Sequence, residues 1–143
     1  MDGKTLDSMI LEKAAATLIK GHAIYCAQLA KHADVADLET YRDSVLKRFE
    51  YTFETAKKLI KQHLPYQRSS LAFADHLEFY REAMQRQLIN NAVDWLKFQE
   101  IRQRILHDYT YEFSYQVIDI VPKFLTCVAD TVTRLRKLET EQG

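Results

Sequence analysis

Apolar side chains recur every three or four residues along most of this chain, and this spacing is the strongest constraint on its fold. One such stripe runs from about Leu6 to Lys31, and a second follows the polar residues 32–37. A period near 3.6 residues is typical of an amphipathic α-helix. The pattern predicts two long helices, and Pro65 should end the second near Leu64. The stripe positions are Ile10, Ala14, Leu18, His22, Tyr25 and Leu29, then Val45, Phe49, Thr52, Ala56, Leu59, Ile60 and His63.

The remainder of the chain has the same helical character. We expect further helices over about Leu71 to Ile89, Ala92 to Asp108 and Glu112 to Leu138, with an Asn-Asn pair separating the first two. Pro122 lies inside the last segment, so that helix either kinks or a new helix begins there.

These elements define the expected fold class. Three glycines and two prolines in 143 residues leave few places for hairpin turns. Short connections between long amphipathic helices favour an all-α, up-and-down bundle of four or five helices. We expect one domain over residues 1–139 and a short disordered tail over residues 140–143.

Charge and cysteine usage exclude several classes of protein. Lys plus Arg equals Asp plus Glu at 20 each, so any contact with nucleic acid or anionic lipid must be a local patch. The cysteines, Cys26 and Cys127, stand singly in apolar stretches and are expected to be buried free thiols. The N-terminus lacks the apolar run of a signal peptide, and no stretch approaches the roughly 18 apolar residues that span a membrane. A cytoplasmic location is therefore expected.

Several cofactor motifs do not occur. No Glu is followed by His three residues later, and GxGxxG, Walker, HExxH and paired-cysteine patterns are missing. We therefore expect no cofactor and no metal. Any catalysis should depend on side chains alone.

The segment from Trp95 to Tyr111 is the remaining candidate for a functional site, because it contains Arg102, His107 and Tyr109 in an Arg-x4-His-x-Tyr pattern. At 100° per residue, Arg102 shares a broad side of the helix with the apolar positions, which are Trp95, Phe98, Ile105, Leu106 and Tyr109. A guanidinium there must find a carboxylate, carbonyl or phosphate partner, or lie at a partly wet interface. His107 borders the polar face, where Gln103 also lies.

Two interpretations of this pattern remain open. An imidazole can take a proton from a ribose 2′-hydroxyl while a guanidinium holds the developing phosphorane charge, which suffices for metal-free RNA cleavage. Alternatively, Arg102 reaches a surface carboxylate and His107 caps the helix C-terminus.

Residues 42–58, RDSVLKRFEYTFETAKK, resemble the second-helix signature of HEPN proteins encoded beside minimal nucleotidyltransferases, often called nucleotidyltransferase substrate-binding proteins. The Arg-x4-His-x-Tyr stretch is similar to the motif of the HepT toxins in the same family, whose antitoxin partner is MntA. The resemblance covers essentially the whole chain. Two positions depart from the family pattern: Gln103 replaces a common Asn, and Lys57 stands where an aromatic residue is expected.

The resemblance implies a homodimer in which two motifs meet in a composite RNase site, acting on RNA with tRNA as the expected substrate. Arg102 and His107 would be the catalytic residues and Gln103 a supporting one. A separately encoded nucleotidyltransferase would neutralise the toxin by adenylylating Tyr109. A second function is a non-catalytic substrate-binding subunit of a two-component nucleotidyltransferase, and a third is a purely structural helical adaptor.

Overall fold

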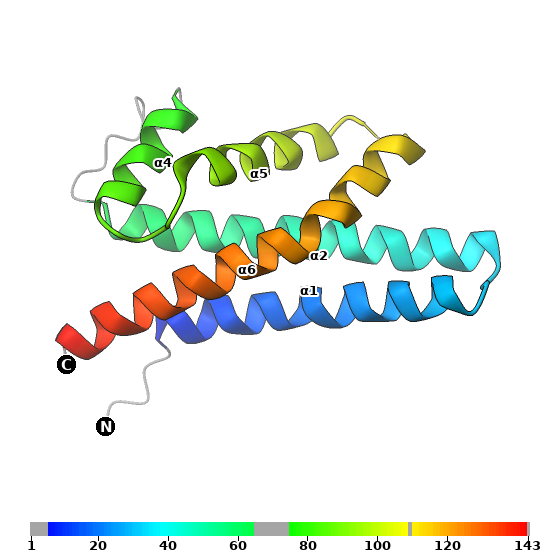
Figure 1. Ribbon diagram of the computed structural model, residues 1–143, viewed down its shortest axis with the longest axis horizontal. Coiled ribbons are helices and arrows are strands. Elements are labelled where there is room, and N and C mark those ends of the chain that lie inside the picture. Colours follow the sequence, from blue (N-terminus) through cyan, green and yellow to red (C-terminus); the bar gives the residue numbers. More distant parts are fainter. Residues whose placement is uncertain (1–5, 65–74, 109, 143) are drawn as a thin grey trace.

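The two long apolar stripes form an antiparallel pair of helices, α1 and α2, which lie side by side over most of their length (Figure 1). The computed structural model describes residues 6–64, 75–108 and 110–142. These residues form helices and no strand, so the expected all-α class is confirmed. The helices are α1 (Asp7–Ala30), α2 (Val35–Gln62), α4 (His76–Gln85), α5 (Ala92–Ile105) and α6 (Tyr111–Gln142).

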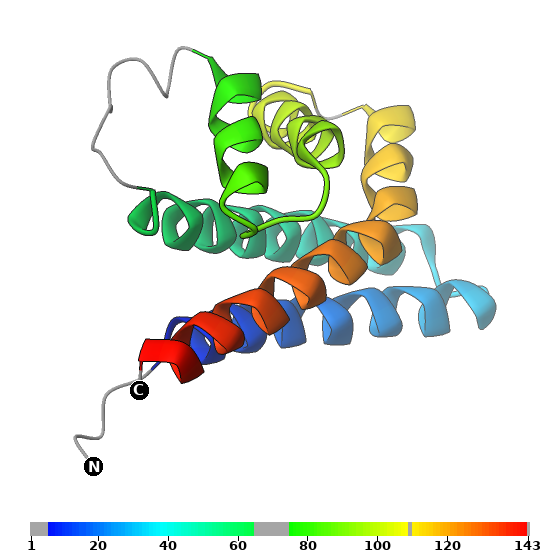
Figure 2. The same cartoon turned by 60° about the vertical axis from the view of Figure 1, so that its left-hand side comes forward.

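The other three helices cover one side of this pair. Helix α6 crosses the pair and contacts both of its members, whereas α5 packs on α2 and α4 packs on α5 (Figures 1 and 2). The start of α1 is tied to the end of α6, because the backbone N–H and the hydroxyl of Ser8 donate hydrogen bonds of 2.9 and 2.6 Å to the carboxylate of Glu139. None of the described helices is both long and apolar enough to cross a membrane.

Three helix boundaries differ from the sequence-based predictions. Helix α4 ends at Gln85 rather than at Ile89, because Gln87 adopts φ 64°, which ends a right-handed helix. Helix α5 stops at Ile105, three residues before the predicted end. Helix α6 runs through Pro122 without interruption and continues to Gln142, so residues 140–142 are helical where a tail was predicted. Figure 2 shows a bend in the first half of α6, the half that contains the proline. Residues 71–74, the predicted start of the third helix, lie outside the described part.

An aromatic cluster fixes α5 against α2 and α6. Trp95 and Phe98 of α5 are fully buried, and the Phe98 ring lies 5.0 Å from that of Phe124 in α6. Phe124 in turn lies 4.6 Å from Phe49 of α2. Burial of each such ring contributes about 1.5–3 kcal/mol. Because this packing orients α5, Arg102, two turns beyond Trp95, faces α2.

Most of the predicted core positions are confirmed. In α2 every apolar stripe position is buried, but in α1 Ile10 and Leu29 are exposed and Leu11 is buried instead. The cause is that α1 contacts both α2 and α6, which shifts its buried face relative to a single stripe. Cys127 is a buried free thiol as predicted, whereas Cys26 is exposed and its predicted burial is wrong.

Candidate functional site

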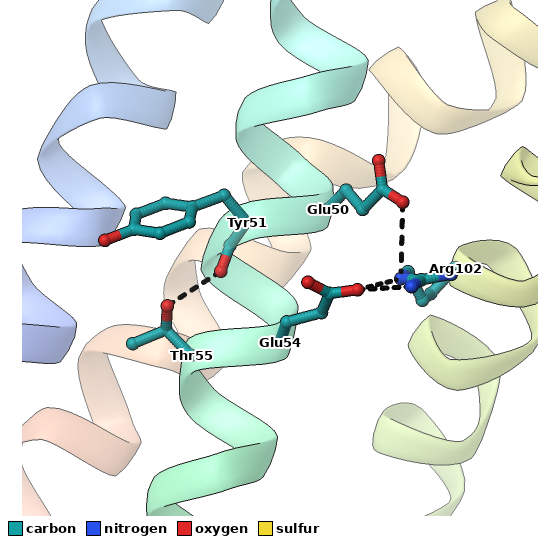
Figure 3. Close-up of polar contacts among 5 residues, drawn as sticks. All are labelled: Glu50, Tyr51, Glu54, Thr55 and Arg102. Carbon is teal, nitrogen blue, oxygen red and sulfur yellow. Dashed lines mark hydrogen bonds and ion pairs between the residues drawn. The ribbon is translucent and has the colours of Figure 1, made fainter.

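Arg102 lies in an ion-pair cluster between α5 and α2 (Figure 3). Its side chain is only 19% exposed. The Nε atom donates a 2.8 Å hydrogen bond to Oε1 of Glu54, and Nη2 donates to the same oxygen. Oε2 of Glu50, one turn earlier on α2, lies 3.5 Å from Nε. Arg102 thus has the polar partner that a guanidinium on this side of the helix requires.

This arrangement sets the charge at the motif arginine. One guanidinium faces two carboxylates here, and Arg102 also lies close enough to Lys57 for their charges to interact. Glu50 and Glu54 stand four residues apart on one helix face, where like charges destabilise a helix unless a cation lies between them. Arg102 therefore stabilises the α2 surface, where Nε and Nη2 are both engaged by Glu54.

His107 and Tyr109 lie beyond the end of α5. The His107 side chain is exposed in the turn after the helix, and its backbone N–H donates to the carbonyl of Arg104 at 3.1 Å. Among the described residues, the imidazole has no side-chain hydrogen bond or ion pair. Tyr109, the predicted site of adenylylation, lies outside the described residues.

Gln103 contacts a histidine that lies outside the Arg-x4-His-x-Tyr pattern. Its Nε2 lies 3.3 Å from Nε2 of His76, the first residue of α4. Burial, together with the nearby Lys57 ammonium, lowers the pKa of His76 below its usual range, against the opposing effect of Asp75. A neutral imidazole can accept a hydrogen bond from the Gln103 amide. Gln103 is thus held by α4 rather than directed at Arg102.

Lys57, one of the departures from the family pattern, lies close to the same cluster. Burial is the main cause that lowers its pKa, and the charges of Arg102 and Lys61 lower it further. Its ammonium lies 5.7 Å from the centroid of the Phe79 ring. Because the charge of Arg102 lowers the pKa of Lys57, the two cations belong to the same electrostatic site between α5 and α2.

The connection from α5 to α6 is held by Asp108. Its carboxylate accepts a 2.9 Å hydrogen bond from the backbone N–H of Thr110 and a 2.8 Å bond from Nε of Arg104. These bonds, with those from Thr110 foremost, lower the pKa of Asp108 to about 2. The Thr110 hydroxyl accepts from the N–H of Phe113, which caps the first turn of α6.

A cleft of about 250 Å³ opens between α2 and the end of α5, beside the Arg102 cluster. Glu50 belongs both to its wall and to the ion-pair cluster. Its lining is Asp43, Leu46, Lys47, Glu50, Ile105 and Leu106. Leu106, predicted to share the apolar side of α5, is 55% exposed at the edge of this cleft.

Glu50, Glu54 and His76 are the members of the site that sequence reasoning missed. The two glutamates do lie in the second-helix block, and their four-residue spacing marks one helix face. That spacing is typical of a charged helix face with local ion pairs. The spacing of the two glutamates does not identify Arg102 of α5 as their partner.

Comparison with known proteins places this fold. The structure matches that of HI0074 from Haemophilus influenzae with a TM-score of 0.74 and 18% sequence identity, covering 90% of this chain and 98% of that one. The structure of HI0074 is described as revealing the fold of a substrate-binding domain of a nucleotidyltransferase. A search of curated proteins finds no match. The sequence profile of the family described as "Nucleotidyltransferase substrate binding protein like" matches residues 11–137, which include both motif blocks. The chain therefore belongs to the nucleotidyltransferase substrate-binding protein family.

Proposed function

We propose that this protein is the non-catalytic, substrate-binding subunit of a two-component nucleotidyltransferase whose catalytic subunit is separately encoded. The observation that carries the proposal is the engagement of Arg102 by Glu50 and Glu54. An arginine neutralised within its own chain is suited to shaping a surface, whereas a phosphate clamp needs a guanidinium that no carboxylate of its own chain engages. The described role of the Haemophilus influenzae protein as a substrate-binding domain adds support through the shared fold.

Co-expression with the neighbouring nucleotidyltransferase gene tests this function. We expect the two chains to copurify as a complex, and we expect nucleotidyl transfer to a substrate by the complex to exceed that by the catalytic chain alone. A matched control pairs the chain with a nucleotidyltransferase from an unrelated locus. Transfer rates that do not change on addition of this chain, together with separate elution of the two proteins, would reject the proposal.

A second candidate is a metal-independent ribonuclease toxin acting on RNA, with tRNA as the expected substrate. The exposed imidazole of His107, which has no side-chain partner among the described residues, favours it. His107 would serve as general acid or base, and Arg102 would leave Glu54 to hold the phosphate. Two chains would have to meet to complete the composite site, and AMP attached to Tyr109 would block it sterically and by charge.

RNA cleavage by the purified chain in the presence of EDTA distinguishes this candidate. His107→Ala and Arg102→Ala should each abolish cleavage and growth inhibition, whereas Glu54→Gln should preserve or raise cleavage because it releases the arginine. Light scattering should show a dimer. Intact-mass measurement after co-expression should show AMP on the wild type and none on Tyr109→Phe. Absence of cleavage, or cleavage that survives His107→Ala, would exclude the ribonuclease.

A further inference from the structure

Three tyrosines gather around a buried arginine where α1, α2 and α6 meet. Arg42 of α2 is 9% exposed, and its Cζ lies 4.3 Å from the ring centroid of Tyr111, the first residue of α6. Tyr115, one turn further along α6, has its ring centroid 5.7 Å from that of Tyr111. Tyr25 of α1 completes the group at 3% exposure, close enough that Arg42 and Tyr115 both influence its ionisation.

The charge of Arg42 is stabilised by Tyr111 and by nearby carboxylates, without an ion pair among the described residues. Its Nε atom is buried and has no hydrogen-bond partner, and within the described ranges Arg42 forms no ion pair with a carboxylate. Burying a guanidinium is costly unless it is paired and hydrogen-bonded. The cation–π contact with Tyr111 offsets part of this cost. Glu39 and Asp43 are exposed neighbours whose charges favour the protonated guanidinium without bonding to it.

Two aromatic rings beside this cation remain open to solvent. Tyr111 is 43% exposed and Tyr115 is 45% exposed, and the two rings lie one turn apart on the same helix. Exposed aromatic rings beside a cation are a common way to bind nucleotides, because the base stacks on a ring and the phosphate pairs with the cation.

The hydroxyl of Tyr25 adds a hydrogen-bond donor. Burial, followed by the proximity of Tyr115, raises the pKa of Tyr25 above its usual range. A phenolic hydroxyl is protonated at neutral pH in any case, so it can donate to a phosphate oxygen.

We propose that Arg42, Tyr111 and Tyr115 form a binding site for a single nucleotide, with the phosphate at Arg42 and the base against the tyrosine rings. The flanking carboxylates of Glu39 and Asp43 disfavour a polyphosphate chain, so a nucleoside monophosphate fits better than a triphosphate. The choice of a nucleotide as ligand rests on the proposed function. The chemistry of the site requires only an anion joined to a planar group.

Titration of the full-length chain alone tests this site, with AMP, adenosine and inorganic phosphate as probes and calorimetry or tyrosine fluorescence as the readout. AMP should bind at least about tenfold more tightly than either fragment, because it uses both the cation and the stacking surface. Arg42→Gln should weaken AMP binding by about tenfold or more. Tyr115→Leu, at an exposed position that leaves the core intact, should weaken it by about fivefold or more. The control variant Arg81→Gln, at an exposed arginine of α4, should bind as the wild type does.

Circular dichroism of each variant separates loss of binding from loss of fold. Wild-type affinity in a folded Arg42→Gln or Tyr115→Leu protein would overturn the proposal, as would the absence of AMP binding at millimolar concentration. Loss of AMP binding in Arg102→Gln with wild-type binding in Arg42→Gln would place the nucleotide between α2 and α5 instead, which rejects this site and retains the proposed function. Failure to form a complex with the nucleotidyltransferase would reject the proposed function and leave the AMP measurement unaffected, because that titration uses this chain alone.

Discussion

The ion pair between Arg102 and Glu54 should be measurable as a coupling free energy in a double-mutant cycle. The cycle compares the wild type with Arg102→Met, Glu54→Gln and the double variant by urea unfolding. If the guanidinium is committed to α2, the two single substitutions should not be additive. A matched control cycle measures the coupling of Arg102 with Glu100 instead of Glu54. Glu100 is an exposed glutamate of α5 that forms no ion pair with Arg102.

The structure sets the size of this coupling. Glu54 is 53% exposed, and exposed ion pairs contribute about 0.2–1 kcal/mol. Arg102 is only 19% exposed and donates two hydrogen bonds to one oxygen, which raises the expectation to the upper end of that range, about 1 kcal/mol. Arg102→Met also leaves Glu50 and Glu54 as a like-charge pair without the guanidinium between them, which costs about 0.2–0.5 kcal/mol more. The free energy of unfolding should therefore fall by about 1.5 kcal/mol in Arg102→Met, and Tm by about 5 °C.

The control and the salt dependence decide the outcome. The coupling between Arg102 and Glu100 should be near zero, and 1 M salt should reduce the coupling with Glu54 because its carboxylate is half-exposed. A coupling with Glu54 that does not exceed the control would refute the reasoning. Arg102 would then be energetically available to phosphate, and the ribonuclease would become the stronger of the two candidate functions.

Three further predictions concern positions away from the ion-pair cluster. Gly21→Ala should lower the free energy of unfolding by about 0.5–1 kcal/mol in urea melts, because the new Cβ would lie 2.8 Å from Cδ of Arg48. Losing the hydrogen bond that Arg48 donates to a carbonyl of α1 should outweigh the gain of about 1 kcal/mol in helix propensity, so a net stabilisation would contradict the reasoning. Tyr80→Phe should cost about 1–3 kcal/mol on thermal unfolding, since the buried Oε1 of Gln99 loses its 2.7 Å hydrogen bond, and an unchanged Tm would oppose this. Asp108 has a folded pKa of about 2, below its unfolded value, so its stabilising effect is present above about pH 4 and is lost as the pH falls toward 2. Unfolding measured against pH should accordingly be flatter in this range for Asp108→Asn, and identical profiles would show that the carboxylate is not selectively stabilised.

The helices themselves could be predicted from the sequence because helix formation depends on neighbours three and four residues apart. The stripe of α2 from Val45 to Ile60 is buried as its spacing predicts, and Trp95 and Phe98 mark the buried face of α5. Local spacing was a weaker guide to where helices end. The positive φ of Gln87, which ends α4, has no signal in apolar periodicity. The end of α6 is tied through Glu139 to Ser8, at the other end of the chain, and local spacing carries no signal of this contact.

The candidate site divides in the same way. The sequence by itself determined that Arg102 lies on the side of α5 that faces the protein, since it falls two turns after Trp95, and that it must therefore find a polar partner. Only the tertiary structure decided that the partners are Glu50 and Glu54, about 50 residues earlier, and that Gln103 turns to His76 instead. The physical reason is that a helical period fixes which residues share a face, whereas the pairing of two faces depends on the rotation and offset at which α5 packs on α2, and the buried aromatic rings of the core set both.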